Sequence, residues 1–100
     1  MKHRHDLRKL ARGQPCLIRV PGVCVADVAS TVLCHVRMIG ISGIGMKSPD
    51  MLAAHGCHAC HSAVDGQTKT DYTYEQRRIM LLEGMARTQA WLIEQEIVTW

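Results

Sequence analysis

The sequence predicts a small α+β domain of the treble-clef type, closed by a bound metal and covered by a long C-terminal helix. Its cysteines include two pairs, Cys16 with Cys24 and Cys57 with Cys60, one pair in each half of the chain. Four thiolates are a preferred tetrahedral ligand set of structural zinc, so we expect the pairs to close one zinc site across the domain. Helical periodicity over residues 73–98 predicts the covering helix.

Length and composition favour one domain, residues 1–100. A chain of this length buries only roughly 60–65% of its unfolded surface, so a bound metal would contribute strongly to its stability. The sequence has no apolar run near the roughly 18 residues of a membrane span, and no membrane partner is expected. The charged N-terminus lacks the apolar stretch of a signal peptide, so we expect a cytoplasmic protein whose paired cysteines hold metal.

Residues 1–12 form a predicted basic N-terminal arm. Its basic residues, set against the single Asp6, are Lys2, Arg4, Arg8, Lys9 and Arg12. Such an arm suits contact with nucleic-acid phosphates, and a solvated terminus is the alternative. Within it, residues 5–12 are predicted to form a short helix that begins near Asp6, with Leu7 and Leu10 pointing inward.

Three predicted strands follow. Residues 16–20 alternate weakly and are predicted as a strand, after which Pro21-Gly22 turns the chain toward Cys24 and makes a knuckle-like hairpin. Residues 31–36 are β-branched and apolar, which favours a strand. The stretch before Cys57 is expected to contain a further strand that pairs back on residues 31–36.

The segment 40–49 is rich in glycine and proline and is predicted as a loop. It is not a phosphate-binding P-loop, because Met46 stands where that motif needs lysine. A short helix is expected from Cys60 to near Gly66. In the long helix, we expect one face to cover the core, with Gly84 as a possible bend. That face comprises Ile79, Leu82, Met85, Ala86 and Ile93.

Alternatives to the four-cysteine zinc site remain. A mixed site could use His55 or His58, and the thiols could simply be buried. Otherwise these two histidines are expected at the surface or beside the ligands. Cys34, the fifth cysteine, lies within a predicted strand and is expected in the core.

A second metal site is suggested by His35, His61 and Asp65. His35 lies on the first strand of the expected hairpin, while His61 and Asp65 are four residues apart on the helix after it and therefore share a face. Two strands and a helix with these residues make a ββα-metal nuclease motif. Phosphodiester hydrolysis needs a base to activate water, for which histidine is suited, and a divalent cation such as Mg²⁺ or Mn²⁺.

Each of these residues also has a structural interpretation. His35 could be an ordinary polar strand residue or a zinc ligand, and His61 could replace a cysteine at the zinc. Asp65 could simply end its helix, and Asp50 could be a metal ligand, although we expect it to cap the next element. Candidate phosphate contacts are Arg4, Arg8, Lys9, Arg37 and Lys47, with solvated charge as the alternative.

Several motifs resemble the YbcO-like small proteins of phages and prophages. They are Leu7–Gly13, Cys16 with Arg19–Cys24, Thr31–His35, Gly45–Asp50, Cys57–His61 with Asp65-Gly66, and Leu82–Thr88. That resemblance implies an HNH-like nuclease. Compared with HNH and phage resolvase-type endonucleases, the four paired cysteines match the zinc ligands, His35 the general base and His61 the helical metal ligand. Cys34 replaces the metal-binding residue that commonly precedes the base, and the central asparagine has no clear match near residues 50–52.

Together, these observations predict a metal-dependent endonuclease acting on nucleic acid in phage or prophage DNA metabolism. One alternative is a non-catalytic zinc module that binds DNA or a protein. Another is a structural adaptor that forms a homodimer through its long helix.

Overall fold

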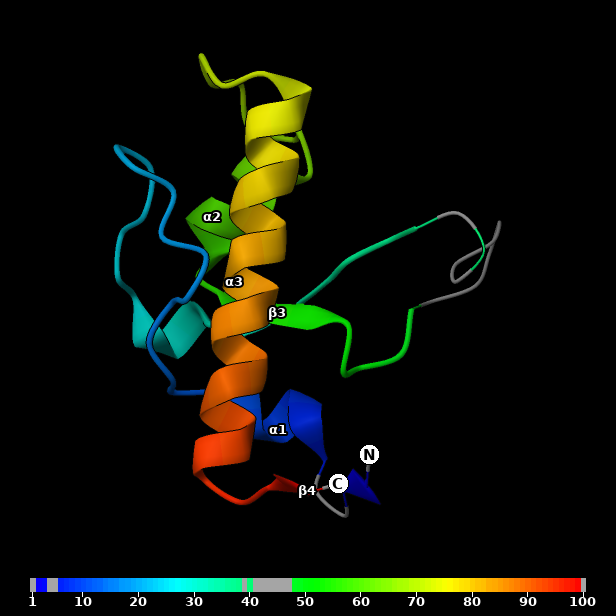
Figure 1. The fold of residues 1–100 in the computed structure, drawn as a ribbon. Helices are drawn as coiled ribbons and strands as arrows, with labels where there is room; N and C mark the ends of the chain where they lie inside the picture. Colours follow the sequence, from blue (N-terminus) through cyan, green and yellow to red (C-terminus); the bar gives the residue numbers. More distant parts are fainter. Residues whose placement is uncertain (1, 4–5, 39, 41–47, 100) are drawn as a thin grey trace.

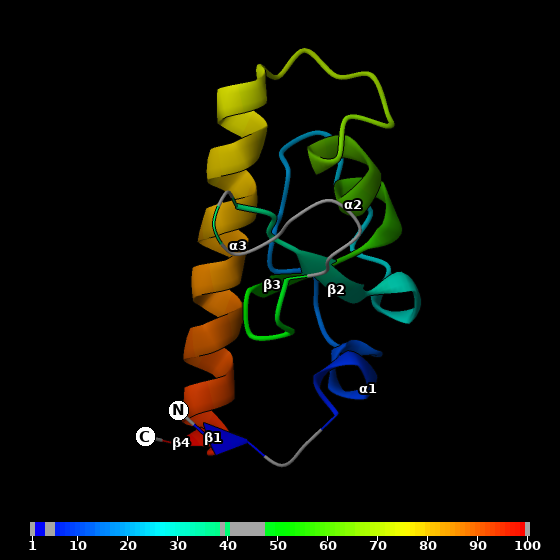
Figure 2. The same cartoon turned by 90° about the vertical axis from the view of Figure 1, so that its right-hand side faces the viewer.

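The computed structural model of the protein describes residues 2–3, 6–38, 40 and 48–99. The helix α3 (Tyr74–Glu94) runs along one side of the molecule, and the other helices lie on one side of it (Figures 1 and 2). In chain order the other elements are β1 (Lys2–His3), α1 (Leu7–Ala11), a 3₁₀ turn (Val28–Ser30), β2 (Val32–His35), β3 (Ala53–Gly56), α2 (His58–Val64) and β4 (Val98–Thr99). No helix among the described residues is long and apolar enough to cross a membrane.

The central sheet is the antiparallel pair β2–β3, which confirms the predicted hairpin of residues 31–36 with the strand before Cys57. Val32 pairs with Gly56 and His35 with Ala53, and the Val36 amide extends the ladder by donating to the Leu52 carbonyl at 2.8 Å. Every residue of β3 is buried. Three of its four residues, Ala53, Ala54 and Gly56, are small, which allows α3 to pack directly over the strand.

The predicted strand over residues 16–20 is wrong. Arg19 has a φ of 57°, a left-handed conformation that ends extended pairing. The segment instead contacts the sheet through a hydrogen bond from the Leu17 amide to the His55 carbonyl, 2.7 Å long. The predicted turn at Pro21-Gly22 is confirmed, because the amides of Val23 and Cys24 both donate to the Val20 carbonyl.

The buried face of α3 differs in part from the one that hydropathy predicts. Leu82 and Met85 are partly buried and pack against the core, as predicted. Ile79 and Ile93 are 54% and 42% exposed, respectively, and Ala86 is exposed as well. The face that packs inward comprises Leu81, Gly84, Thr88 and Leu92. It includes a glycine and a threonine, which hydropathy does not assign to a core.

Gly84 and Thr88 are buried because they fit α3 closely onto the sheet. A Cβ on Gly84 would lie 3.0 Å from the Ile18 Cα and 3.2 Å from the Ala54 Cβ. The Thr88 hydroxyl accepts the His55 amide at 3.0 Å and donates to the Gly84 carbonyl at 2.8 Å. Gly84 is therefore a contact point within a continuous helix.

Both ends of the chain pack against the body. The helix predicted over 73–98 ends at Glu94, because Glu96 has a φ of 57° and the chain turns into β4, which pairs with β1. At the other end, Asp6 caps α1 by accepting two backbone amides, and the apolar side of α1 is buried. The described residues of the basic segment 1–12 thus include β1 and α1, which are part of the folded body. The short helix predicted from Cys60 begins earlier, at His58.

The packing at Gly56 gives a test of this core. A Cβ on Gly56 would lie 2.5 Å from the Ile18 Cδ1 and 2.8 Å from the Cys34 Sγ. We expect Gly56→Ala to lower the free energy of unfolding by about 1–3 kcal/mol through overpacking, and Ile18→Val to lower it by about 0.5–1.5 kcal/mol. Because Ile18→Val removes the Cδ1 atom, the double variant should lose less than the sum. Urea unfolding measures all three, and additive losses would contradict the predicted contact.

Candidate functional site

Four cysteine thiols meet at one point. The Sγ atoms of Cys16, Cys24, Cys57 and Cys60 all lie within 4.8 Å of one another, and those of Cys24 and Cys57 are 3.9 Å apart. Sulfurs bound to one tetrahedral zinc at about 2.3 Å are separated by about 3.8 Å. None of the five cysteines, all of which the structure describes, forms a disulfide. The cluster therefore has the ligand types and the spacing to hold a metal ion such as zinc.

The turn at residues 21–23 and the start of α2 position these thiols. Cys16 and Cys24 lie on either side of the turn, Cys57 is the N-cap residue of α2, and Cys60 lies in its first turn. Burial raises the pKa of the Cys57 thiol, but the amides of Cys60 and Val25 and neighbouring thiols outweigh it and lower that pKa to about 6. Burial raises the pKa of Cys24 and Cys60. A metal would have to displace the protons of these thiols.

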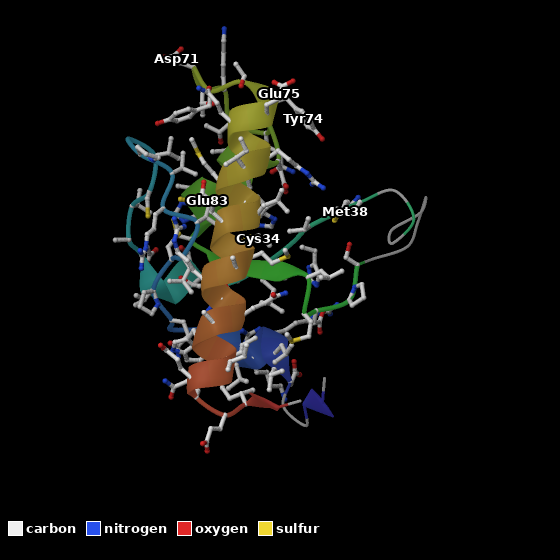
Figure 3. All side chains as sticks on the ribbon, in the orientation of Figure 1. Cys34, Met38, Asp71, Tyr74, Glu75 and Glu83 are labelled. Atoms are coloured by element: carbon white, nitrogen blue, oxygen red, sulfur yellow. The ribbon has the colours of Figure 1, made fainter. Side chains whose placement is uncertain are left out.

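The other cysteine and two of the histidines lie outside this group. Cys34 is 1% exposed, in the body of the molecule (Figure 3), and burial raises the pKa of its thiol. His55, expected at the surface or beside the ligands, is instead 1% exposed and packs edge-on to Trp91. Burial lowers the pKa of His55. His58 is exposed, and its ring contacts the Ser30 hydroxyl at 3.0 Å. A mixed site with either histidine is not formed.

A cavity of about 520 Å³ contains most of the remaining candidates. Its walls come from α1, from β2 and the residues after it, and from α2 and its C-terminal end. Its lining residues are Arg8, Leu33, His35, Arg37, Ser48, His61, Asp65 and Gln67. Five residues selected from the sequence, far apart in the chain, thus share one cavity. Among the other candidate phosphate contacts, Lys9 is exposed on α1, and Arg4 and Lys47 lie outside the described residues.

The His35 side chain contacts the carboxylate of Asp50, a residue that was expected to cap the next element. Its Nε2 lies 2.8 Å from an oxygen of Asp50, and the same oxygen lies 3.5 Å from the Nε of Arg8. The hydrogen bond from His35 lowers the pKa of Asp50, and Arg8 lowers it further. The expectation that Asp50 caps the next element is wrong, since its side chain pairs with His35 and Arg8.

The partnership of His35 and Asp50 follows from the strand pairing. Since His35 pairs with Ala53, residues just before Ala53 lie beside the end of β2. An acidic residue three positions before Ala53 is visible in the sequence. Its pairing with His35 can be predicted only when the register of the sheet is known.

His61 and Asp65 contact each other, as their spacing predicts. The His61 Nε2 lies 3.1 Å from a carboxylate oxygen of Asp65, and the two side chains are 39% and 41% exposed. Adjacent ligands of one octahedral cation, each at about 2.1 Å, are separated by about 3.0 Å. The pair can therefore offer two ligand atoms to a cation. Among the described residues, no third histidine, cysteine or acidic side chain completes a compact ligand group with them.

Comparisons with known proteins agree on one family. The family model described as "Putative nuclease YbcO" matches residues 5–97. The chain is 47% identical over 91 residues to "Putative nuclease YbcO" of Escherichia coli K12, covering 89% of this chain and 93% of that protein. A protein of Enterobacteria phage 82 with the same description matches equally well.

A solved structure supports the same relationship. It is described as "Structure of a putative bacteriophage protein from Escherichia coli str. K-12 substr. MG1655", and it aligns with a TM-score of 0.77 and 36% sequence identity. The alignment covers 91% of this chain and all of the other. With a family match over nearly its whole length, two relatives at 47% identity and a shared fold, this chain belongs to the YbcO family.

Proposed function

We propose that the protein is a metal-dependent endonuclease with an HNH-like, ββα-metal site built on a zinc-bound treble clef. The observation that carries this proposal is the cavity shared by His35, His61, Asp65, Arg8 and Arg37. It combines a candidate base, two candidate metal ligands and two cationic side chains, which are the groups that phosphodiester hydrolysis needs. The nuclease names of the relatives support nucleic acid as the substrate class.

His35 acts as the general base in this proposal. Asp50 stays ionised because its pKa is lowered, and an ionised carboxylate only accepts hydrogen bonds. The Nε2 of neutral His35 therefore carries the proton that Asp50 accepts, and the lone pair is on Nδ1. The His35 side chain is 20% exposed, so water can reach it. Asp50 is the positioning residue, since it fixes the tautomer with a basic Nδ1.

His61 and Asp65 would hold the catalytic cation. A bound Mg²⁺ or Mn²⁺ would supply positive charge for the phosphate and the departing oxygen. Mg²⁺ is commonly held by one or two carboxylates together with water and substrate phosphates. A site with only two protein ligands fits that pattern. Cys34, which is buried, takes no part in it.

Arg8 and Arg37 would contact the phosphates on either side of the cut. Both line the cavity, and the Arg8 side chain is 55% exposed despite its ion pair with Asp50. Arg4, Lys9 and Lys47 remain predicted contacts of the same electrostatic kind.

The four-cysteine site would hold structural zinc. It joins the turn at residues 21–23 to the start of α2. In α2, His61 lies four residues after Cys57, about one helical turn, and directly after Cys60. Zinc would thus fix the helix that bears the second metal site.

The alternative is a zinc module that binds DNA or a protein without cutting. It shares the zinc site and the cationic side chains but does not require His35 or His61. A cleavage assay distinguishes the two proposals, because only the nuclease cuts nucleic acid.

The deciding variant is His35→Ala. We expect it to retain zinc, fold and DNA affinity while cleavage falls by roughly 10²–10⁴-fold, because a positioned proton acceptor contributes that much. His61→Ala should also lose cleavage, with partial recovery at higher Mg²⁺ or Mn²⁺ concentration. Linear, nicked, single-stranded and branched DNA are the substrates. Cleavage that survives His35→Ala would refute the site, and no metal-dependent cleavage by the wild type would favour the binding module.

Asp50→Asn tests the positioning role. The amide removes the charge and no longer favours the Nε2 proton, so kcat should fall by at least about 10-fold, as when such a tautomer is lost in other catalytic histidine–carboxylate pairs. The KM for DNA and the melting temperature should stay unchanged. Arg8→Gln is the matched control, because it removes the other partner of Asp50 and should act mainly on KM. If Asp50→Asn lowers the melting temperature as well as the activity, Asp50 has a structural role only.

Removal of a zinc ligand tests the metal centre. Structural zinc contributes an apparent ~10–16 kcal/mol in finger-like peptides, which is as large as the stability of most small domains. Cys57→Ser should therefore give a chain without zinc and without a cooperative melting transition. Cys34→Ala is the control, since it removes a buried thiol outside the cluster and should keep one zinc per chain. A metal-free protein that melts at the wild-type temperature would contradict the prediction.

A further inference from the structure

A second hollow adjoins the candidate active-site cavity. Its volume is about 190 Å³, and it shares His35, Arg37 and Asp65 with the larger cavity. The other residues that line it are Val64, Tyr74, Arg78 and Leu81. Its walls therefore lead from the candidate base to the first turn of α3. Its volume is below the roughly 300–1,000 Å³ of pockets that enclose a drug-sized ligand, so it suits a smaller group.

The far end of this hollow carries an exposed aromatic ring. Tyr74 is 65% exposed and lies at the start of α3 (Figure 3). The guanidinium of Arg77 lies 5.8 Å from the centre of the Tyr74 ring. Arg77 is also close to Gly66, where a Cβ would come within 2.8 Å of its Nη1. Arg77 is thus held between the ring and the loop after α2, and it supports the ring from one side.

Two arginines beside the ring are arranged for phosphate. The Nη2 of Arg78 donates to the backbone carbonyl of Arg37 at 2.7 Å. This bond uses one of the five N–H donors of the guanidinium and fixes the position of its charge. The Arg37 side chain lines both hollows. Apolar Val64 and Leu81 complete the wall between the arginines and the ring.

An aromatic ring, an apolar wall and two arginines are groups that can bind an unpaired nucleotide. Successive bases of single strands stack on aromatic side chains while cationic side chains follow the backbone. Bases within a duplex are stacked on one another and would have to be extracted first.

We propose that Tyr74, Arg78 and Arg37 form a nucleotide subsite that binds one unpaired base and its phosphate next to the bond to be cut. The subsite rests on the proposed nuclease function and narrows its substrate to single-stranded nucleic acid or to unpaired nucleotides at ends and branches. Tyr74 supplies the stacking surface, and the arginines hold the adjoining phosphate.

The test measures binding separately from cleavage. The zinc-loaded full chain is titrated with a short oligothymidylate and with a blunt duplex of the same length, at one salt concentration and without Mg²⁺ or Mn²⁺. Fluorescence anisotropy gives both values of Kd. Tyr74→Ala should weaken oligothymidylate binding by roughly 5- to 150-fold, the range expected for one lost base stack, and should leave the duplex nearly unchanged. Tyr74→Phe should retain wild-type affinity.

Two matched variants control for general effects. Ile79→Ala removes another exposed apolar side chain of α3 that lines neither hollow, and it should bind both ligands normally. Arg78→Gln should weaken oligothymidylate binding more than Arg12→Gln, which removes the same charge at an exposed position of the chain outside both hollows.

The outcomes separate the subsite from the nuclease. Equal losses for both ligands in Tyr74→Ala, or no loss, would overturn the subsite, as would a wild type that does not bind the oligothymidylate. If cleavage needs His35 while Tyr74→Ala binds normally, the nuclease stands and the subsite is wrong. If binding needs Tyr74 but the wild type cuts no substrate with added metal, the subsite stands and the nuclease proposal is wrong.

Discussion

Ile18 lies beneath two glycines, Gly56 of β3 and Gly84 of α3, and a side chain on either glycine would come within 3.0 Å of it. This contact brings three segments together: the stretch between α1 and the turn at residues 21–23, the central sheet and the long helix. Thr88, one turn along α3 from Gly84, accepts the His55 amide and holds the helix to β3. The close packing fixes where Cys16 meets Cys57, because each cysteine is within two residues of the contact. It therefore determines the geometry of the cysteine cluster.

The candidate active site depends on the same arrangement. β2 ends at His35, beside the edge of the sheet where Asp50 enters, and α2 begins at the cysteine cluster and presents His61 and Asp65 to the same cavity. Asp50 lies between an imidazole and a guanidinium, and both partners keep the pKa of its carboxyl low. In the proposed mechanism a persistent negative charge at this point orients the histidine, and the same carboxylate forms an ion pair with Arg8 of α1. One carboxylate thus contacts both the candidate base and a cationic side chain of the N-terminal helix.

The α3 helix has two different faces, one that packs on the core and one that lines the proposed subsite. Its buried face contains Gly84, which allows close packing, and Thr88, whose hydroxyl forms hydrogen bonds. Its first two turns present Tyr74 and Arg78 to the hollow beside His35. Residues that look like a core stripe in the sequence, such as Ile79 and Ile93, are largely exposed. A helix that covers a core can therefore also line a hollow beside the candidate active site, because this hollow lies between the end of β2 and the start of α3.

Local patterns in the sequence determined several features. The cysteine spacing selected the four clustered thiols, the i, i+4 spacing paired His61 with Asp65, and β-branched residues located β2. These features depend on short-range periodicity or on the ligand preferences of metals. Only the tertiary structure decided that Asp50 pairs with His35, that Arg19 breaks the expected strand, and that Gly84 lies at the closest helix–sheet contact. Each of these depends on strand register, on a left-handed backbone or on interatomic fit. Such properties arise from segments distant in the chain meeting in space, and neither hydropathy nor residue spacing encodes them.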